Sequence, residues 1–262
     1  MSNSKDSLGN RMKTYYEAIP KTSLMRRTPV AIRIDGKAFH TFTRGFERPF
    51  DTLLVNVMQQ TTKKLCENIQ NCVFGYTQSD EITLILVDYK DINTAAWFDY
   101  EVQKLCSISA SMATLYFNKF FKQSVEEFDI NSIIKEKEVD NYKLLNSYKR
   151  ALNTGAMFDS RCFNIPKEEV CNLIYWRQLD ATRNSIQMVG QANFSHKELQ
   201  GLTCNKIQDK LITETDINWN NYPTYLKRGT SCLKKDSEWI LDMNMPILKG
   251  EDRKYVEDLI FI

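Results

Sequence analysis

Residues 73–89, VFGYTQSDEITLILVDY, constrain the fold of this chain more than any other segment. Two apolar runs rich in β-branched and aromatic residues flank the polar stretch TQSDE. This pattern predicts two strands joined by a tight turn, and therefore a sheet that is antiparallel at this point. The turn places the carboxyl groups of Asp80 and Glu81 directly before the second strand.

A second apolar segment, TPVAIRID at residues 28–35, has proline only at its entry and ends in Asp35-Gly36. It predicts a buried strand with a carboxylate at its end. Asp-Gly is a common hairpin-turn sequence, so each acidic site taken alone is explained by an ordinary turn. If the two segments lie side by side, their acids would meet and could hold metal ions.

The cysteine and histidine content narrows the choice of metal. Seven cysteines without a CxxC pair, together with only two histidines, argue against a disulfide framework and against a zinc site. Oxygen ligands would favour magnesium or manganese. The chain also lacks the GxxxxGK, GxGxxG and GxSxG motifs, so paired metals on shared carboxylates are the remaining route to nucleotide chemistry.

The size of 262 residues, with 42% hydrophobic and 26% charged residues, suits one large domain or two closely packed ones. No apolar run is long enough to cross a bilayer, and the N-terminal segment has no signal-peptide core, so we expect no membrane partner and a cytoplasmic location, with a mitochondrial one as the alternative. The net charge is only +2. Basic pairs such as Arg26-Arg27 and Lys227-Arg228 are candidate phosphate contacts, with a solvated surface as the alternative.

The remaining pattern predicts helices at residues 5–19, at 51–69 with Asp51 as the cap, at 95–121 and at 167–190, and a strand at 156–166. Residues 122–150 are charged and Asn-rich, and we expect a surface excursion or an inter-domain connection there. After residue 190 we expect short helices and a turn at 227–230.

Four segments carry a family resemblance: RIDGKAFHTFTRGFERPFD, GYTQSDEITLIL, AMFDSRCFNIP and WRQLDATRNSI. In this order they resemble the motifs of the tRNA-His guanylyltransferase superfamily, and within it the tRNA-His guanylyltransferase-like branch of 3′-5′ RNA polymerases. The similarity spans roughly residues 5–245, and the ordered set is far more specific than any one motif.

The resemblance implies an α+β fold with a polymerase- or cyclase-like palm, whose mainly antiparallel sheet is flanked by helices, and a helical C-terminal elaboration. It predicts a palm-like catalytic core with an N-terminal helix in residues 1–135. The remaining palm strand and a helical C-terminal region would occupy residues 136–262, packed with the core as one unit. A homotetramer is also implied.

The resemblance also implies site residues. Asp35, Asp80 and Glu81 would be catalytic, and two Mg²⁺ ions would be held by Asp35, the carbonyl of Gly36 and Asp80. The nucleotide, which is ATP, GTP or another NTP, would be bound by Asp35, Gly36, Lys37, Ala38, Phe39, His40, Arg48, Ser79, Asp80, Lys104 and Asn184. Asn184 matches an asparagine implicated in the activation step. The RNA partner would be a tRNA.

Two departures from the family pattern refine the functional prediction. Where enzymes that add one guanosine to tRNA-His carry His-Ile-Asn-Asn, this chain reads Thr182-Arg183-Asn184-Ser185, and Arg48 replaces a family lysine. The missing histidine favours template-dependent repair of tRNA 5′ ends, after adenylylation of a 5′-monophosphate, over non-templated addition of G to tRNA-His. The same acids would also suit a palm-type nucleotide cyclase, and if they are merely turns the chain would be a non-catalytic RNA-binding module.

Overall fold

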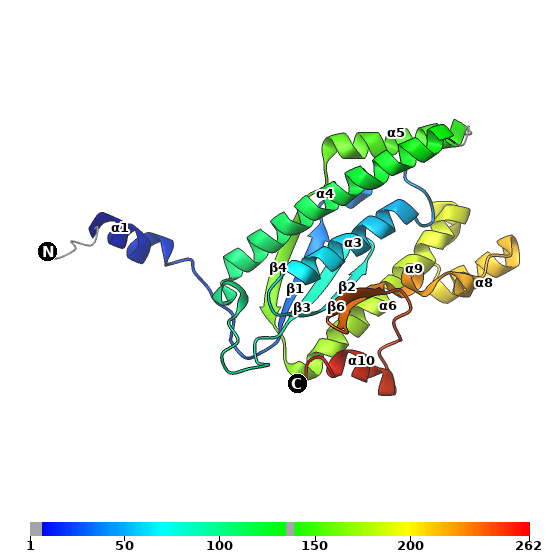
Figure 1. Cartoon of the computed structure of the whole chain (residues 1–262). Coiled ribbons are helices and arrows are strands. Elements are labelled where there is room, and N and C mark those ends of the chain that lie inside the picture. The colour runs from blue at the N-terminus through cyan, green and yellow to red at the C-terminus, as the bar shows by residue number, and fades with distance from the viewer. Residues whose placement is uncertain (1–6, 135–138) are drawn as a thin grey trace.

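A computed structural model, which describes residues 7–134 and 139–262, places a six-stranded sheet at the centre of the chain. The strand order is β4-β1-β3-β2-β5-β6, and each neighbouring pair is antiparallel (Figure 1). The strands are β1 (Val30–Gly36), β2 (Cys72–Gln78), β3 (Glu81–Leu86), β4 (Phe158–Asn164), β5 (Thr230–Lys235) and β6 (Glu238–Asp242). The predicted α+β class with an antiparallel sheet is thereby confirmed.

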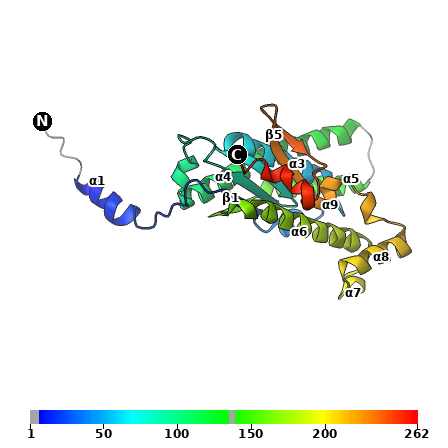
Figure 2. The same cartoon turned by 90° about the horizontal axis from the view of Figure 1, so that it is seen from below.

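Helices cover both faces of the sheet (Figures 1 and 2). The helices α3 (Thr52–Asn68), α4 (Val102–Ile134) and α5 (Val139–Thr154) pack on one face, and α6 (Lys167–Asn193) with α10 (Lys254–Glu257) on the other. The shorter helical elements are α1 (Ser7–Met12), a π-helical segment Lys13–Glu17, α2 (Phe39–Phe42), α7 (His196–Leu199), α8 (Cys204–Thr215), α9 (Thr224–Arg228) and the 3₁₀ turns Trp97–Tyr100, Trp219–Asn221 and Gly250–Arg253. None of the described helices is long and apolar enough to cross a membrane.

The two-residue period of β1 decides which face carries the charged side chains. Val30, Ile32 and Ile34 are buried against α3 and α4, whereas Ala31 belongs to the core on the α6 side. Because side chains alternate along a strand, Arg33 and Asp35 share the α6 side with Ala31. The polar end of β1 is therefore directed towards α6.

Several predicted elements are confirmed. The strand at 28–35 and the two strands flanking residue 80 are β1, β2 and β3, and the strand at 156–166 is β4. The predicted cap of the helix after residue 51 is also present, since the Asp51 carboxylate accepts a hydrogen bond from the backbone N–H of Leu54 (2.9 Å). The helix predicted at 167–190 is α6.

The N-terminal helix is confirmed for residues 7–17, while residues 5 and 6 of the prediction lie outside the described residues. It buries none of its side chains and projects away from the sheet (Figures 1 and 2). The predicted boundary between residues 135 and 136 also lies outside the described residues.

The expectation for residues 122–150 was wrong. The long helix α4 begins later than predicted and continues to Ile134, and α5 begins at Val139. Leu145, Tyr148 and Ala151 of α5 are buried in the core, and the Tyr148 hydroxyl donates to the Asp51 carboxylate (2.7 Å). The few apolar residues recur every three or four positions on one helix face, and the charged residues between them concealed that pattern.

The C-terminal region contains a hairpin that the sequence pattern did not predict. Strands β5 and β6 are joined at Asp236 and Ser237, both with positive φ (49° and 69°), as in a two-residue hairpin turn. Asp-Ser is not a typical sequence for such a turn, and the charged residues of these strands hide the alternation. The predicted turn at 227–230 is where α9 ends and β5 begins.

Candidate active site

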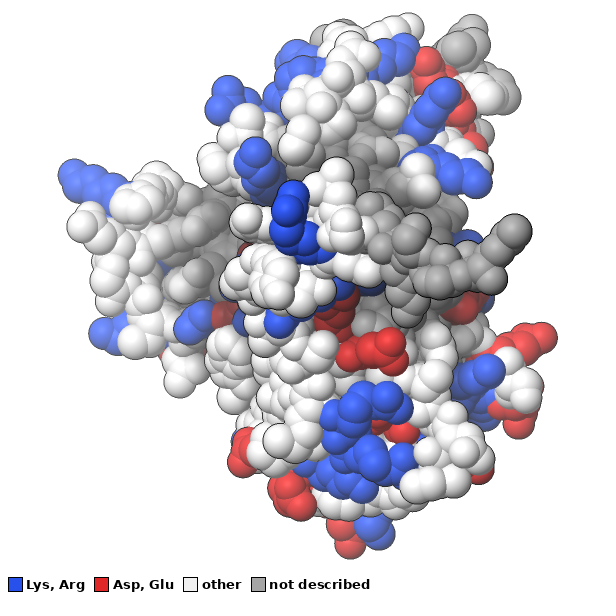
Figure 3. Space-filling model, turned by 90° about the vertical axis from the view of Figure 1, so that its left-hand side faces the viewer, with Lys and Arg blue, Asp and Glu red and all other residues white. Residues whose placement is uncertain are grey.

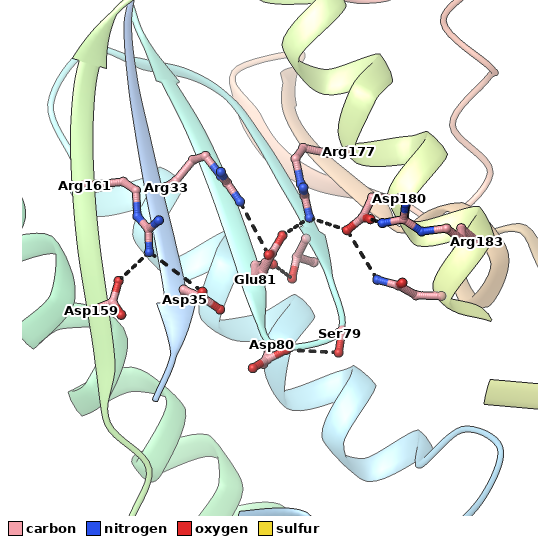
Figure 4. Close-up of polar contacts among 12 residues, drawn as sticks. Arg33, Asp35, Ser79, Asp80, Glu81, Asp159, Arg161, Arg177, Asp180 and Arg183 are labelled. Atoms are coloured by element: carbon pink, nitrogen blue, oxygen red, sulfur yellow. Dashed lines mark hydrogen bonds and ion pairs between the residues drawn. The ribbon is translucent and has the colours of Figure 1, made fainter. Parts of the chain in front are cut away.

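The acidic ends of the strands meet at one end of the sheet (Figure 4). Asp35 lies opposite Glu81 of β3 on one side and opposite Asp159 of β4 on the other. The backbone N–H of Gly36 donates to the carbonyl oxygen of Asp80 (3.1 Å), which joins the end of β1 to the β2–β3 turn. The acids of two segments that are far apart in the sequence are thus neighbours.

Asp80 is the electrostatically strained member of this group. Burial raises the pKa of its carboxyl group to about 6, and the negative charge of Asp35 adds to the rise. The Ser79 hydroxyl donates to the Asp80 carboxylate (3.1 Å) and partly offsets it. A raised pKa of this origin means that the ionised pair lacks sufficient positive charge around it.

The donor set fits a hard divalent cation. Asp35 and Asp80 offer carboxylate oxygens, and the adjoining Gly36 offers a backbone carbonyl, which are the ligand types that Mg²⁺ prefers. The unfavourable ionisation of Asp80 beside Asp35 is what such a cation would relieve. Within residues 7–134 and 139–262, no three His, Cys, Asp or Glu side chains converge as ligands, so the predicted site would depend on two side chains, a main-chain oxygen and the bound nucleotide.

Glu81 differs from the other two acids because two arginines hold it. Arg33 of β1 lies 3.4 Å from one carboxylate oxygen, and Arg177 of α6 pairs with the other. Both guanidinium groups lie near the indole of Trp176, with centroid distances of 5.3 and 4.6 Å. These contacts fix the orientation of Glu81 at the end of β3.

Asp180 extends this network along α6 to the predicted nucleotide residue Asn184. Its carboxylate accepts hydrogen bonds from Arg177 (2.8 Å) and from the Asn184 side chain (3.3 Å), and it also pairs with Arg183. Sequence reasoning missed Arg177 and Asp180. Their signal was the spacing of three and four residues between positions 177, 180 and 184, which aligns the side chains on one helix face.

Arg161 of β4 is a further charged residue that sequence reasoning missed. Its guanidinium lies 3.1 Å from Asp159 and 3.9 Å from Asp35, and it is 55% exposed. The alternation Asp159, Ser160, Arg161 in a predicted strand places Asp159 and Arg161 on the same face of the sheet, and β1 brings Asp35 to that face as well. This cation is available to an anionic ligand beside Asp35.

An open pocket of about 640 Å³ adjoins the carboxylates. Its walls come from α3, the β2–β3 turn, α6 and the segment at 225–230, and the predicted residues Ser79 and Asn184 line it. Phe50, Met58, Met188 and Tyr225 make part of the wall apolar, while Gln59 and Asn184 supply polar groups. An apolar hollow with a few polar groups suits a planar base.

The segment at 36–40, predicted to wrap a triphosphate, is held in place mainly by its own backbone and by one ring. The N–H groups of Gly36 and Lys37 donate to the carbonyl oxygens of Asp80 (3.1 Å) and Met157 (2.8 Å), so two of the expected phosphate donors are used within the protein. Phe39 is buried among Phe42, Phe117 and Phe158. Ala38 has a left-handed conformation and His40 is exposed.

Two other predicted residues lie away from the carboxylates. Arg48 is exposed and precedes the cis peptide bond to Pro49. Lys104 lies in the first turns of α4, where it pairs with Glu101 (3.4 Å), and in the part of the chain that the structure describes no ion pair links it to Asp35 or Asp80.

The basic pairs proposed as phosphate contacts serve the fold instead. Arg26 pairs with Asp88 (2.6 Å). Lys227 is buried, and its ammonium group donates to the carbonyl oxygen of Asn220 (2.6 Å). Burial lowers the pKa of Lys227. Figure 3 shows the Lys and Arg side chains of one face as several separate groups rather than a continuous patch.

Comparisons with known proteins agree with this arrangement. The sequence profile of the family described as tRNAHis guanylyltransferase matches residues 9–166. The tRNA(His) guanylyltransferase of Saccharomyces cerevisiae is 25% identical over 259 residues, which cover 94% of this chain and 95% of the yeast protein.

Solved structures give closer similarity. A bacterial tRNA(His) guanylyltransferase (Thg1)-like protein in complex with ATP superposes with a TM-score of 0.82 and 40% identity, covering 98% of this chain and all of the other. A bacterial protein of the same description in complex with GTP gives a TM-score of 0.78 and 36% identity, with the same coverage.

Proposed function

Because this chain belongs to the tRNAHis guanylyltransferase family, a family of nucleotidyltransferases, we propose that it adds nucleotides to the 5′ end of a tRNA in the 3′-5′ direction. The observation that carries the proposal is the junction of Asp35 with Asp80 beside a pocket that fits a nucleotide base. The ATP and GTP complexes of the bacterial proteins support nucleotides as ligands.

The reaction has two transfers. The 5′-monophosphate of the RNA attacks the α-phosphorus of ATP, a new P–O bond forms, and pyrophosphate leaves. The 3′-hydroxyl of an incoming NTP then attacks the 5′ phosphorus of the adenylylated RNA, loses its proton, and expels AMP. When the RNA begins with a 5′-triphosphate, pyrophosphate leaves in this step instead.

Asp35, Asp80 and the carbonyl of Gly36 would hold two Mg²⁺ ions. When bound, these ions lower the pKa of the attacking hydroxyl and neutralise charge on the departing phosphates. Arg161 would contribute positive charge beside the phosphates, because its guanidinium is exposed next to Asp35. Arg33 and Arg177 would keep Glu81 oriented towards the reacting groups.

The pocket would hold the base of the nucleotide. Ser79 and Asn184 line the pocket at its polar side, and Asp180 fixes the Asn184 amide by accepting its hydrogen bond (3.3 Å). The segment at 36–40 and Arg48 would bind the triphosphate. The polymerase-like palm, with residues 1–135 and 136–262 packed as one unit, and a homotetramer complete the proposal. Its support is that β4, β5 and β6 pair into the same sheet as β1 and β2.

We assign the choice of nucleotide to the template strand of the acceptor stem. Position 182 carries Thr and position 183 carries Arg, and Arg183 is an exposed side chain paired with Asp180. No histidine is available there for the non-templated addition of guanosine. Watson–Crick pairing with the opposing nucleotide would then orient the NTP, and orientation is worth several kcal/mol of barrier.

The test uses a tRNA that lacks its first acceptor nucleotide, with ATP, all four NTPs and Mg²⁺. We expect restoration of the complementary base, and changing the opposing base from C to A should switch incorporation from G to U. Guanosine addition regardless of that base would restore the tRNA-His-specific function. Cyclic nucleotide formed without RNA would replace both by a cyclase.

A further inference from the structure

A second hollow, of about 850 Å³, lies beyond the C-terminal end of β1. The loop at 37–44 forms one wall, and the end of α5 with the segment leading into β4 forms the other. Lys37, Thr41, Arg44, Arg150, Thr154 and Gly155 are among its lining residues, and the lining includes no Asp or Glu. The hollow therefore carries positive charge only.

The positive charge of this hollow is not neutralised within the described part of the chain. One Nη of Arg150 donates to the carbonyl oxygens of Phe42 (2.8 Å) and Arg44 (2.7 Å), which fixes the guanidinium without cancelling its charge. Lys37 and Arg44 are exposed. In residues 7–134 and 139–262, none of these three cations pairs with a carboxylate. A hollow with this charge concentrates anions.

The hollow adjoins the acidic end of the sheet. Lys37 follows Asp35 by two residues, and its N–H donates to the carbonyl oxygen of Met157 (2.8 Å), which also lines the hollow. Gly36 lies opposite Phe158 at the start of β4. A polyanion whose end reaches Asp35 and Asp80 can therefore have its following phosphates over the hollow.

The lining does not suit a base. Phe42 is the aromatic residue of the lining, and its ring is buried and packed against Phe39, Phe117 and Phe121. The remaining lining is made of threonines, cations and small residues. Stacking needs an accessible ring face, whereas phosphate recognition needs cations and hydroxyls.

We propose that this hollow binds phosphodiester groups of the RNA substrate next to its 5′ end. The proposal rests on the proposed function, because it assumes an RNA that delivers its 5′ end to Asp35 and Asp80. The contacts would hold the strand in place without reading its sequence. The shared chemistry is phosphate binding, and the alternative source is the triphosphate of an NTP.

The test measures the Kd of a 5′-monophosphorylated tRNA, truncated at its first nucleotide, as a function of KCl concentration. The variants are Arg44→Gln, Arg44→Lys and Arg150→Gln, and the control is Lys206→Gln, which removes an exposed cation from α8. We expect Arg44→Gln to weaken binding about tenfold, as for a charged hydrogen bond, and to reduce the log–log salt slope by about 0.7–0.9 per lost phosphate contact. Arg44→Lys should keep most of the slope, and Lys206→Gln should match the unaltered protein.

Three further measurements separate the outcomes. An RNA with a 5′-hydroxyl should lose as much affinity on Arg44→Gln as the monophosphorylated one; a loss confined to the monophosphate would assign the hollow to the terminal phosphate and overturn the proposal. A raised KM for the NTP at unchanged RNA Kd would assign it to the triphosphate, with the same consequence. Equal Kd values for all variants would also overturn it, provided that circular dichroism shows Arg44→Gln folded. If the unaltered protein binds no tRNA, the proposed function fails first.

Discussion

The backbone N–H of Gly36 donates to the carbonyl oxygen of Asp80 across 3.1 Å. This bond joins β1 to the β2–β3 turn through main-chain atoms only. The relative placement of Asp35 and Asp80 is therefore set by the sheet and not by the carboxyl groups themselves. The acids can be altered one at a time without removing the frame that holds them.

Asp35→Asn and Asp80→Asn should each reduce nucleotide addition by at least about 10²–10³-fold, because a neutral amide cannot replace an anionic ligand shared by two cations. The measurement is incorporation of labelled NTP into a 5′-truncated tRNA in Mg²⁺, with adenylylation followed separately. Circular dichroism should match the unaltered protein. Near-normal turnover by either folded variant would remove the carboxylates from the mechanism.

The stability of the metal-free protein should fall as pH rises through the range of the Asp80 titration. Burial raises the pKa of Asp80 to about 6 in the folded chain, against about 3.9 for an unfolded aspartate. Between these values the folded state keeps a proton that the unfolded state has lost, so the free energy of unfolding decreases as pH increases. Urea unfolding in EDTA at pH 4.5 and 7 checks this.

Asp80→Asn supplies the control for that experiment, since an amide does not titrate. The variant should lose less stability than the unaltered protein between the same two pH values. Identical pH dependence of the two proteins would mean that Asp80 ionises at its ordinary pKa in the folded chain.

Two arginines that share the acceptor Asp180 should differ greatly in their contribution to stability. Arg177→Met leaves the carboxylates of Glu81 and Asp180 without a buried partner, since the Arg177 side chain is 4% exposed. We expect a loss of about 3–5 kcal/mol in the free energy of unfolding.

Arg183→Met is the matched control, because the Arg183 side chain is 62% exposed. An exposed pair contributes at most about 1 kcal/mol. Urea denaturation of both variants gives the comparison. Equal losses would contradict a dominant contribution from the buried Arg177.

Gly36→Ala should destabilise the protein and reduce nucleotide addition through a steric effect on Phe39. A Cβ added at Gly36 would overlap the Phe39 ring, which is packed among Phe42, Phe117 and Phe158. We expect a loss of about 1–3 kcal/mol. A double-mutant cycle with Phe39→Leu measures the coupling, and the double variant should be more stable than the sum of the single losses predicts. Strict additivity would assign the role of Gly36 to something other than this contact.

The elements that the sequence predicted are those whose signal is local. The strands around Asp35 and Asp80 are continuous apolar runs, and α3 has an explicit cap in Asp51. In α5 the apolar positions that reach the core, such as Leu145 and Tyr148, are few and lie among charged residues. Their burial depends on α4 running alongside, which no local pattern reveals.

The same division applies to the candidate site. Asp35, Asp80 and Glu81 were found because they end predicted strands and match family motifs. Arg177 was not, because its role depends on α6 crossing the end of the sheet and bringing a buried guanidinium to Glu81. Lys227 looked like a surface cation in the sequence, yet the packing of α9 buries it.

The position of β1 in the sheet governs the order in which the molecule can be built. Its neighbour β3 follows it closely in the chain, but its other neighbour β4 is made only after α4 and α5. During synthesis the edge of β1 that later receives β4 therefore stays without its partner until residues 158–164 have left the ribosome. Pairing over such a sequence separation makes folding slow. A nascent chain that stops short of β4 thus exposes a bare hydrogen-bonding edge beside Asp35, and this is the stage at which chaperones would protect it from aggregation.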